Sequence, residues 1–182
     1  ESLGSVSPLV ASSALEVGSQ TVLNAPLSRV GIETTFVKPG EFDGWRAAAR
    51  PNTRLNFGET VGNPGVDVLD IPTVASIAHE AGLPLLVDST LTTPWLIKPF
   101  EHGADLVYHS ATKFLSGHGT VIGGVVVDGG SFDWDQGSKF PELSQAYEGF
   151  HNMVFTEEST VGAFLLRARR EGLRDFGACM SP

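Results

Sequence analysis

The stretch YHSATKFLSGHGTVIGG, residues 108–124, places one lysine, Lys113, between two different kinds of sequence. Before it, ADLVYHS (residues 104–110) is a short, largely apolar run, and after it VIGGVVVD (residues 121–128) is another. Runs of this length and uniformity predict β-strands that are buried on both faces. We therefore expect Lys113 to follow the carboxyl end of a buried strand, beside a loop rich in glycine, serine and histidine.

Four more runs of the same kind precede this stretch. They are PLVASSAL (8–15), GIETTFV (31–37), RLNFGET (54–60) and LPLLVDS (83–89). Segments with helical periodicity separate several of these runs. Residues 70–82 have apolar side chains at i, i+3, i+4 and i+7 and end at a glycine, a shorter helix is expected over residues 42–49, and a longer one from residue 161 to about 174. This alternation predicts an α/β fold with a mostly parallel sheet, covered by helices on both faces.

The chain length and one polar segment indicate how the domain is organised. The chain of 182 residues is long enough for one domain with a sizeable core and leaves little room for two. Residues 129–149 are polar and rich in turn-forming residues, so we expect a long surface excursion there.

The composition excludes several functions. A net charge of −9 provides no basic field for a nucleic acid or an anionic membrane surface. No apolar run approaches the ~20 residues of a membrane span, and the N-terminal residues lack the features of a signal peptide. The single cysteine, Cys179, cannot form an internal disulfide, which together with the other features favours a soluble protein of the cytoplasm.

Polar side chains follow three of the predicted strands. They are Asn63 after the third run, Asp88, Ser89 and Thr90 after the apolar residues LPLLV of the fourth, and Ser110, Thr112 and Lys113 after the residues ADLVYH of the fifth. Ligands of open α/β sheets bind outside the carboxyl ends of the strands, so these side chains are expected to face one cavity. A partly desolvated lysine amine there is a usable nucleophile toward a carbonyl group.

Asp88 suggests which carbonyl compound is bound. A carboxylate that ends an apolar strand is costly to bury unless it meets a cation, and the pyridinium nitrogen of pyridoxal phosphate is such a cation. The 25 residues from Asp88 to Lys113 suffice for a loop, a crossover and the next strand. Ser110 and Thr112 offer hydroxyl groups to a phosphate. Each residue also has a structural interpretation: Asp88 as a helix N-cap, Lys113 as a solvated side chain, and the hydroxyls as turn formers.

Other cofactor and metal sites find less support. The glycines of GHGTVIGG (residues 117–124) do not follow the G-x-G-x-x-G spacing and lead into a strand, and no phosphate-binding loop of the G-x-x-x-x-G-K-[ST] type occurs. Five histidines show no metal-ligand spacing, so no metal site is expected; they are His79, His102, His109, His118 and His151. We expect structural hydrogen-bonding roles for His109 and His118.

Several segments together resemble the Cys/Met-metabolism family of pyridoxal-phosphate enzymes. They are ETVGNP, LLVDSTLTTP, PFEHGADLVYHSATKFLSGHGTVIGG and LRDFGACMSP. The resemblance implies that Lys113 forms the Schiff base, Asp88 pairs with the pyridinium nitrogen, and Asn63 bonds the phenolic oxygen of the ring. It further implies that Ser110 and Thr112 hold the phosphate and that Thr90 lies against the ring.

The resemblance also implies an activity. Within the family, VDGGSFDW, FPEL and MVFTEE are most similar to the members that carry out gamma-replacement on an O-acylated homoserine with sulfide or a thiol. The alternatives are a cystathionine or methionine gamma-lyase of the same family, or a catalytically incompetent fragment or pseudoenzyme. A nicotinamide-dependent oxidoreductase is a more distant alternative.

Two departures from the family pattern stand out. Where family members have a tyrosine and a glycine, in a YGGT-like stretch whose tyrosine stacks on the ring, this chain has Glu16 and Val17, and an acidic side chain offers no aromatic face. Family members are also longer. By the resemblance, residues 1–182 are the central part of a pyridoxal-phosphate-binding large domain without its N-terminal segment and C-terminal small domain, in a homodimer or homotetramer.

Overall fold

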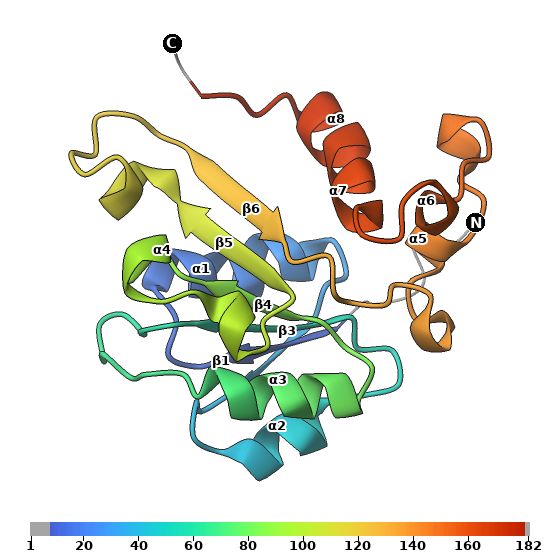
Figure 1. The fold of residues 1–182 in the computed structure, drawn as a ribbon. Coiled ribbons are helices and arrows are strands. Elements are labelled where there is room, and N and C mark those ends of the chain that lie inside the picture. The colour runs from blue at the N-terminus through green and yellow to red at the C-terminus, as the bar shows by residue number, and fades with distance from the viewer. Residues whose placement is uncertain (1–7, 181–182) are drawn as a thin grey trace.

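The computed structural model describes residues 8–180, which form a six-stranded sheet with helices on both faces (Figure 1). The strands are β1 (Leu9–Ser12), β2 (Thr34–Val37), β3 (Leu55–Glu59), β4 (Leu85–Asp88), β5 (Leu106–Ser110) and β6 (Gly124–Asp128). Their order across the sheet is β2-β1-β3-β4-β5-β6, in which β6 runs antiparallel to β5 and the other pairs are parallel. The six predicted strands and the mostly parallel sheet are confirmed.

One face of the sheet is covered by α2 (Phe42–Ala48) and α3 (Ile71–Glu80), which lie together on one side of it in Figure 1. The apolar stripe of α3 packs on Leu85, Val87 and Val107 of the neighbouring strands. Asp70 begins α3 by accepting a hydrogen bond from Thr73 N at 3.1 Å, and its other oxygen accepts one from Thr73 Oγ1 at 2.8 Å. Both predicted helices of this face are confirmed.

The opposite face is covered in two parts. Near β1 and β3, α1 (Val17–Val22) continues into the helical turn Leu23–Leu27 and encloses a small apolar cluster around Ala11 and Leu15. Near β4 and β5 lie α5 (Pro141–Ser144), α6 (Phe155–Glu158), α7 (Ala163–Arg167), the turn Ala168–Leu173 and α8 (Arg174–Phe176). The last three are consecutive and form the helix predicted from residue 161 to about 174.

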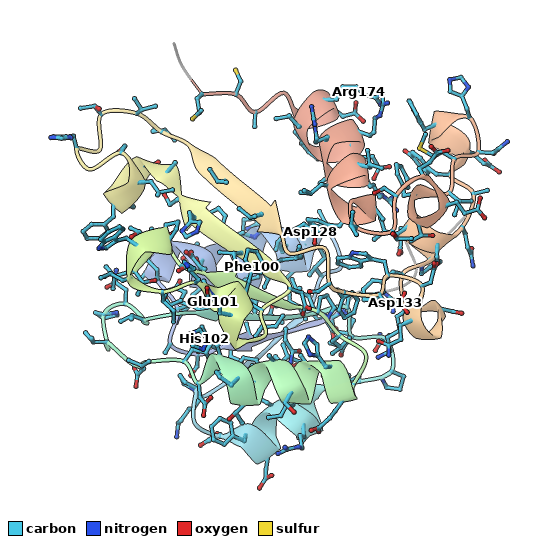
Figure 2. All side chains as sticks on the ribbon, viewed as in Figure 1. Phe100, Glu101, His102, Asp128, Asp133 and Arg174 are labelled. Atoms are coloured by element: carbon cyan, nitrogen blue, oxygen red, sulfur yellow. The ribbon has the colours of Figure 1, made fainter. Side chains whose placement is uncertain are left out.

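Short helical turns connect the remaining elements. They are α4 (Thr93–Leu96), Pro99–His102, Ala111–Leu115, Gln136–Ser138 and Glu148–Phe150. Figure 2 shows Phe100, Glu101 and His102 on the turn that leads into β5, and Asp128 at the end of β6. Because β6 is antiparallel, Asp128 pairs with Leu106 at the start of β5, so it lies at the other end of that strand from Ser110.

The prediction of a surface excursion over residues 129–149 is wrong for its apolar residues. Phe132, Trp134, Phe140 and Leu143 are buried and form a second core cluster with Phe155 and Leu106. The ring centroids of Phe132 and Trp134 are 4.9 Å apart, and those of Trp134 and Phe140 are 5.1 Å apart. The segment is irregular, so its apolar side chains have no periodic spacing that would reveal a buried face.

The structure also bears on the predicted burial of β6 and on the prediction about membrane-spanning segments. Strand β6 was expected to be buried on both faces, but Val125, Val126 and Val127 are exposed, because β6 is the edge strand of the described sheet. Within residues 8–180, no helix has both the length and the apolar character needed to cross a membrane. Residues 1–7, on which the signal-peptide prediction partly depends, lie outside the described part of the chain.

Candidate functional site

The carboxyl ends of three neighbouring strands bring acidic and hydroxyl groups to one edge of the sheet. In register, Glu59 at the end of β3 lies opposite Asp88 at the end of β4, and Asp88 lies opposite Tyr108 of β5. Ser110 ends β5 two residues further on. This is the edge at which an open α/β sheet binds its ligand.

Asp88 and Thr90 form the centre of this edge. The Asp88 side chain is almost buried, with 9% of its residue surface exposed. Its Oδ1 accepts hydrogen bonds from Thr90 N at 2.8 Å and from Thr90 Oγ1 at 2.5 Å. Thr90 Oγ1 in turn accepts a hydrogen bond from Ser110 N at 2.7 Å. The structure therefore brings Asp88, Thr90 and Ser110 together, as the strand-end pattern predicts.

The charge of Asp88 is not neutralised within the described part of the chain. No ion pair or hydrogen bond to a cationic side chain reaches either oxygen there, and Oδ2 has no donor. Burial raises the pKa of the Asp88 carboxyl above its ordinary value, while the two bonds from Thr90 oppose that rise. A buried carboxylate with an unused oxygen is suited to a cationic ligand.

A network of hydroxyl groups stabilises the turn after β4 at this edge. Thr92 Oγ1 lies 2.9 Å from Thr60 Oγ1 and 2.8 Å from Ser89 Oγ. His109 is buried, and its Nδ1 donates to the Ser89 carbonyl oxygen at 3.0 Å. His109 therefore has the structural hydrogen-bonding role expected from the sequence. These contacts fix the turn that carries Asp88 and Thr90.

Thr112 and Lys113 lie in the turn between β5 and β6. Thr112 Oγ1 accepts a hydrogen bond from Gly123 N at 3.0 Å and donates one to the Gly123 carbonyl oxygen at 3.3 Å, which closes the base of the turn. Lys113 interrupts the helical geometry of the turn with φ −91° and ψ −117°, and its side chain is exposed. In residues 8–180 its ammonium group has no hydrogen bond or ion pair, so it is available to a ligand.

Asn63 is not part of the same arrangement. It is exposed in the turn after β3 and lines a cavity of about 680 Å³ together with Gln20, Lys38 and Glu41. None of the other five predicted site residues lines that cavity. The structure therefore groups Asp88, Thr90 and Ser110 by direct contacts and places Thr112 and Lys113 directly after them, while no hydrogen bond joins Asn63 to these residues.

Sequence analysis missed a buried acid at this edge of the sheet, Glu59. Only 7% of its surface is exposed, and its Oε1 accepts a hydrogen bond from the backbone N–H of Glu16 at 2.9 Å. Burial, followed by the charges of Asp88 and Glu16, raises the pKa of Glu59 to about 7, although the bond from Glu16 N lowers it. A signal was present: RLNFGET ends in an acid just as LPLLVDS does, and adjacent parallel strands bring their ends together.

Glu16, at the position where the resemblance expects a tyrosine, is an N-cap. Its Oε2 accepts hydrogen bonds from Gly18 N at 2.7 Å and Ser19 N at 3.2 Å at the start of α1. The side chain is exposed. Its carboxylate therefore serves the first turn of α1, which explains why an acid is stable at this position.

No group of three or more histidine, cysteine or acidic side chains within residues 8–180 is arranged to hold a metal ion. The candidate site consists of carboxyl and hydroxyl groups and one free amine. That set suits an organic ligand with a cationic ring, an electrophilic carbonyl and a phosphate.

Comparison with known proteins gives a consistent result. The sequence pattern of the family described as "Cys/Met metabolism PLP-dependent enzyme" matches residues 3–182. The O-acetyl-L-homoserine sulfhydrylase of Leptospira meyeri is 43% identical over 182 residues, which is 96% of this chain and 41% of that protein. The homocysteine synthase of Schizosaccharomyces pombe is 43% identical over 176 residues, again covering 96% of this chain and 41% of that protein.

Solved structures agree with the fold. A Campylobacter jejuni protein that contains N'-pyridoxyl-lysine-5'-monophosphate superposes with a TM-score of 0.92 at 26% identity, over 97% of this chain and 44% of that one. The O-acetylhomoserine sulfhydrylase of Wolinella succinogenes gives a TM-score of 0.82 at 32% identity, over 97% of this chain and 46% of that one. The chain thus spans about 41% of the length of the curated relatives given above.

Proposed function

Since the chain belongs to the Cys/Met-metabolism family of pyridoxal-phosphate-dependent enzymes, we propose that its strand-end site takes part in gamma-replacement on an O-acylated homoserine. The incoming group is sulfide or a thiol. The observation that carries this proposal is Asp88, a nearly buried carboxylate with an unused oxygen and no cationic partner among the described residues.

The residues at the strand ends fit the cofactor. Asp88 Oδ2 is free to accept a hydrogen bond from a protonated ring nitrogen, and Thr90 holds Oδ1 so that the carboxylate keeps its orientation. Ser110 ends the next strand, Thr112 follows it in the turn, and both would contribute hydroxyl groups to the phosphate. Because Thr112 Oγ1 accepts from Gly123 N and donates to the Gly123 carbonyl oxygen, it would release the bond to that carbonyl in order to donate to a phosphate oxygen.

Lys113 is exposed, and its ammonium group has no hydrogen bond or ion pair within the described residues, so the amine is accessible to a cofactor. Its amine would hold the cofactor covalently and, once displaced by the amino group of the substrate, would move protons at the alpha and beta carbons. When bound, pyridoxal phosphate supplies an electron sink for the carbanion formed at those carbons. Asp88 would keep the ring nitrogen protonated, which maintains that property. Asn63 remains a predicted partner of the phenolic oxygen, from the turn after β3.

The names of the relatives support replacement. Proteins 42–43% identical to this chain are named O-acetyl-L-homoserine sulfhydrylase or homocysteine synthase. One observation favours a lyase as the second candidate: the cystathionine gamma-lyase of Lactobacillus plantarum is 31% identical with a TM-score of 0.66, over 68% of this chain. Product analysis of the longer protein separates the two, because a replacement enzyme yields a sulfur amino acid and a lyase yields ammonia and an oxoacid.

We also propose that residues 1–182 act as the central part of a pyridoxal-phosphate-binding large domain in a homo-oligomer, a dimer or a tetramer, in the cytoplasm. The relatives are more than twice as long, which supports a contribution from chain beyond this segment to the complete site.

The proposed cofactor site is tested with the 182-residue chain itself. Incubation with pyridoxal phosphate should give a visible absorbance band, and borohydride should fix the cofactor to the protein. Lys113→Ala should abolish both signals, whereas Lys98→Ala, which removes an exposed lysine paired with Glu101, should leave them unchanged. Equal trapping in both variants would contradict the assignment of Lys113. A chain that stays colourless would favour the catalytically incompetent fragment.

A further inference from the structure

We propose that Glu59 is a positioning residue of the cofactor site, which holds the first turn of α1 at the strand ends and shares one proton with Asp88. This inference rests on the proposed function, because it assigns the shared charge to a bound cationic ring. It concerns a side chain that no part of the proposed mechanism uses.

The positioning role follows from one contact between distant parts of the chain. Glu59 ends β3, and Glu16 begins α1 after β1, 43 residues earlier in the sequence. The hydrogen bond from Glu16 N to Glu59 Oε1 ties the start of α1 to the strand end beside Asp88. Among the described residues, the Glu16 side chain is bonded only to its own helix turn, so the backbone contact with Glu59 is the hydrogen bond that ties position 16 to the strand end.

The sharing of a proton follows from burial and register. Glu59 and Asp88 are directly opposite each other on adjacent parallel strands, and such strands lie about 4.8 Å apart. Both side chains are nearly buried, and neither forms an ion pair with another residue of the range 8–180. Two buried carboxylates at facing positions of adjacent strands are not both favourable in the ionised form, so one of the two groups keeps a proton.

Glu59 is the group that keeps it. The groups that face Glu59 are Asp88 from β4 and Glu16 from α1, both acidic, together with the neutral Ser19 hydroxyl. Burial raises the pKa of the Asp88 carboxyl too, but two hydrogen bonds from Thr90 and the nearby His109 oppose that rise and stabilise its ionised form. The pair therefore offers one negative charge, on Asp88, and a neutral carboxyl group beside it.

A bound cationic ring would change this balance in a measurable way. A positive charge at Asp88 favours ionisation of the neighbouring carboxyl group, so cofactor binding should release a proton from Glu59. Binding should accordingly become tighter as the pH rises through the Glu59 titration. Without the second acid, in Glu59→Gln, this part of the pH dependence should disappear.

The experiment is a carboxyl-carbon NMR titration of the 182-residue chain, without and with pyridoxal phosphate. In the free chain, Glu59 should titrate with a midpoint of about 7. The amide signal of Glu16 should follow the Glu59 midpoint, lose that response in Glu59→Gln, and keep it in the control Glu157→Gln. Asp88→Asn should lower the Glu59 midpoint, because it removes a like charge.

The outcomes separate this inference from the proposed function. A Glu59 midpoint at the ordinary glutamate value of about 4.3, or a Glu16 amide that does not respond, overturns the inference even if the cofactor binds. A cofactor that binds without lowering the Glu59 midpoint overturns the link between the pair and the ring. If no cofactor binds to a chain whose free titration behaves as expected, the proposed function fails, and with it the assignment of the shared charge to the ring. If Glu59→Gln does not fold, the wild-type and Asp88→Asn titrations still decide the result.

Discussion

Replacing Trp134 by alanine tests whether residues 129–149 belong to the core. The side chain is 5% exposed, packs edge-on against Phe132 and Phe140, and stacks on Phe164 with centroids 5.4 Å apart. Removing a buried tryptophan from such a cluster costs about 3–5 kcal/mol in the free energy of unfolding. With a urea m-value of about 2 kcal/mol/M, the unfolding midpoint should fall by about 2 M.

Trp95→Ala is the matched control, since Trp95 is 91% exposed on α4. Its effect should stay within about 0.5 kcal/mol. Because 3–5 kcal/mol is a large share of a typical stability of about 5–15 kcal/mol, Phe140→Leu provides a milder probe with an expected loss of about 1 kcal/mol. The unfolding of the wild type and of the three variants is followed by urea denaturation monitored by circular dichroism. If the Trp134 variant loses no more stability than the Trp95 variant, the buried aromatic cluster does not exist.

Three further predictions concern stability. Glu59 has a folded pKa of about 7 and an unfolded value near 4.5, so its contribution to stability is complete below about pH 4.5 and is lost as the pH rises to 7. Glu59→Gln should therefore be more stable than wild type at pH 8, by roughly 1–3 kcal/mol in the free energy of unfolding. A stability difference that is the same at acidic and alkaline pH would contradict this. Asp70→Ala should lose about 1 kcal/mol through the N-cap of α3, with Asp70→Asn retaining most of it in thermal unfolding, and equal losses in the two variants would argue against the cap. Gly62→Ala should destabilise the protein by about 1–3 kcal/mol, since its Cβ would lie 2.5 Å from the Ala14 carbonyl oxygen. Gly172→Ala in the last helical run meets no atom within 4 Å and should be neutral or stabilising. The reverse order of their melting temperatures would refute the packing described.

Much of the fold could be predicted from the sequence because the signals are local. Six apolar runs and the periodicity of α2, α3 and the C-terminal helix depend only on residues close together in the chain. The aromatic cluster of residues 129–149 could not be found this way, since its burial depends on contacts of Phe132 and Trp134 with distant helices. The exposure of β6 likewise depends on its place at the edge of the sheet, which the sequence of β6 does not reveal.

The candidate site shows the same division. The strand-end rule predicted that Asp88, Thr90 and Ser110 come together, because parallel neighbours align their carboxyl ends. It did not predict the position of Asn63, since the path of the turn after β3 depends on its own hydrogen bonds. Glu59 was overlooked because its run was interpreted only as a strand, although its last acidic residue lies opposite Asp88.

The most direct test of the central claim is a crystal structure of the chain grown with pyridoxal phosphate. The claim is that the Lys113 amine and the Asp88 carboxylate hold opposite ends of one cofactor ring. We predict electron density that is continuous from Lys113 Nζ to the cofactor, with the ring nitrogen within hydrogen-bonding distance of Asp88 Oδ2. Cofactor bound to another lysine, or a ring nitrogen that faces away from Asp88, would contradict the claim.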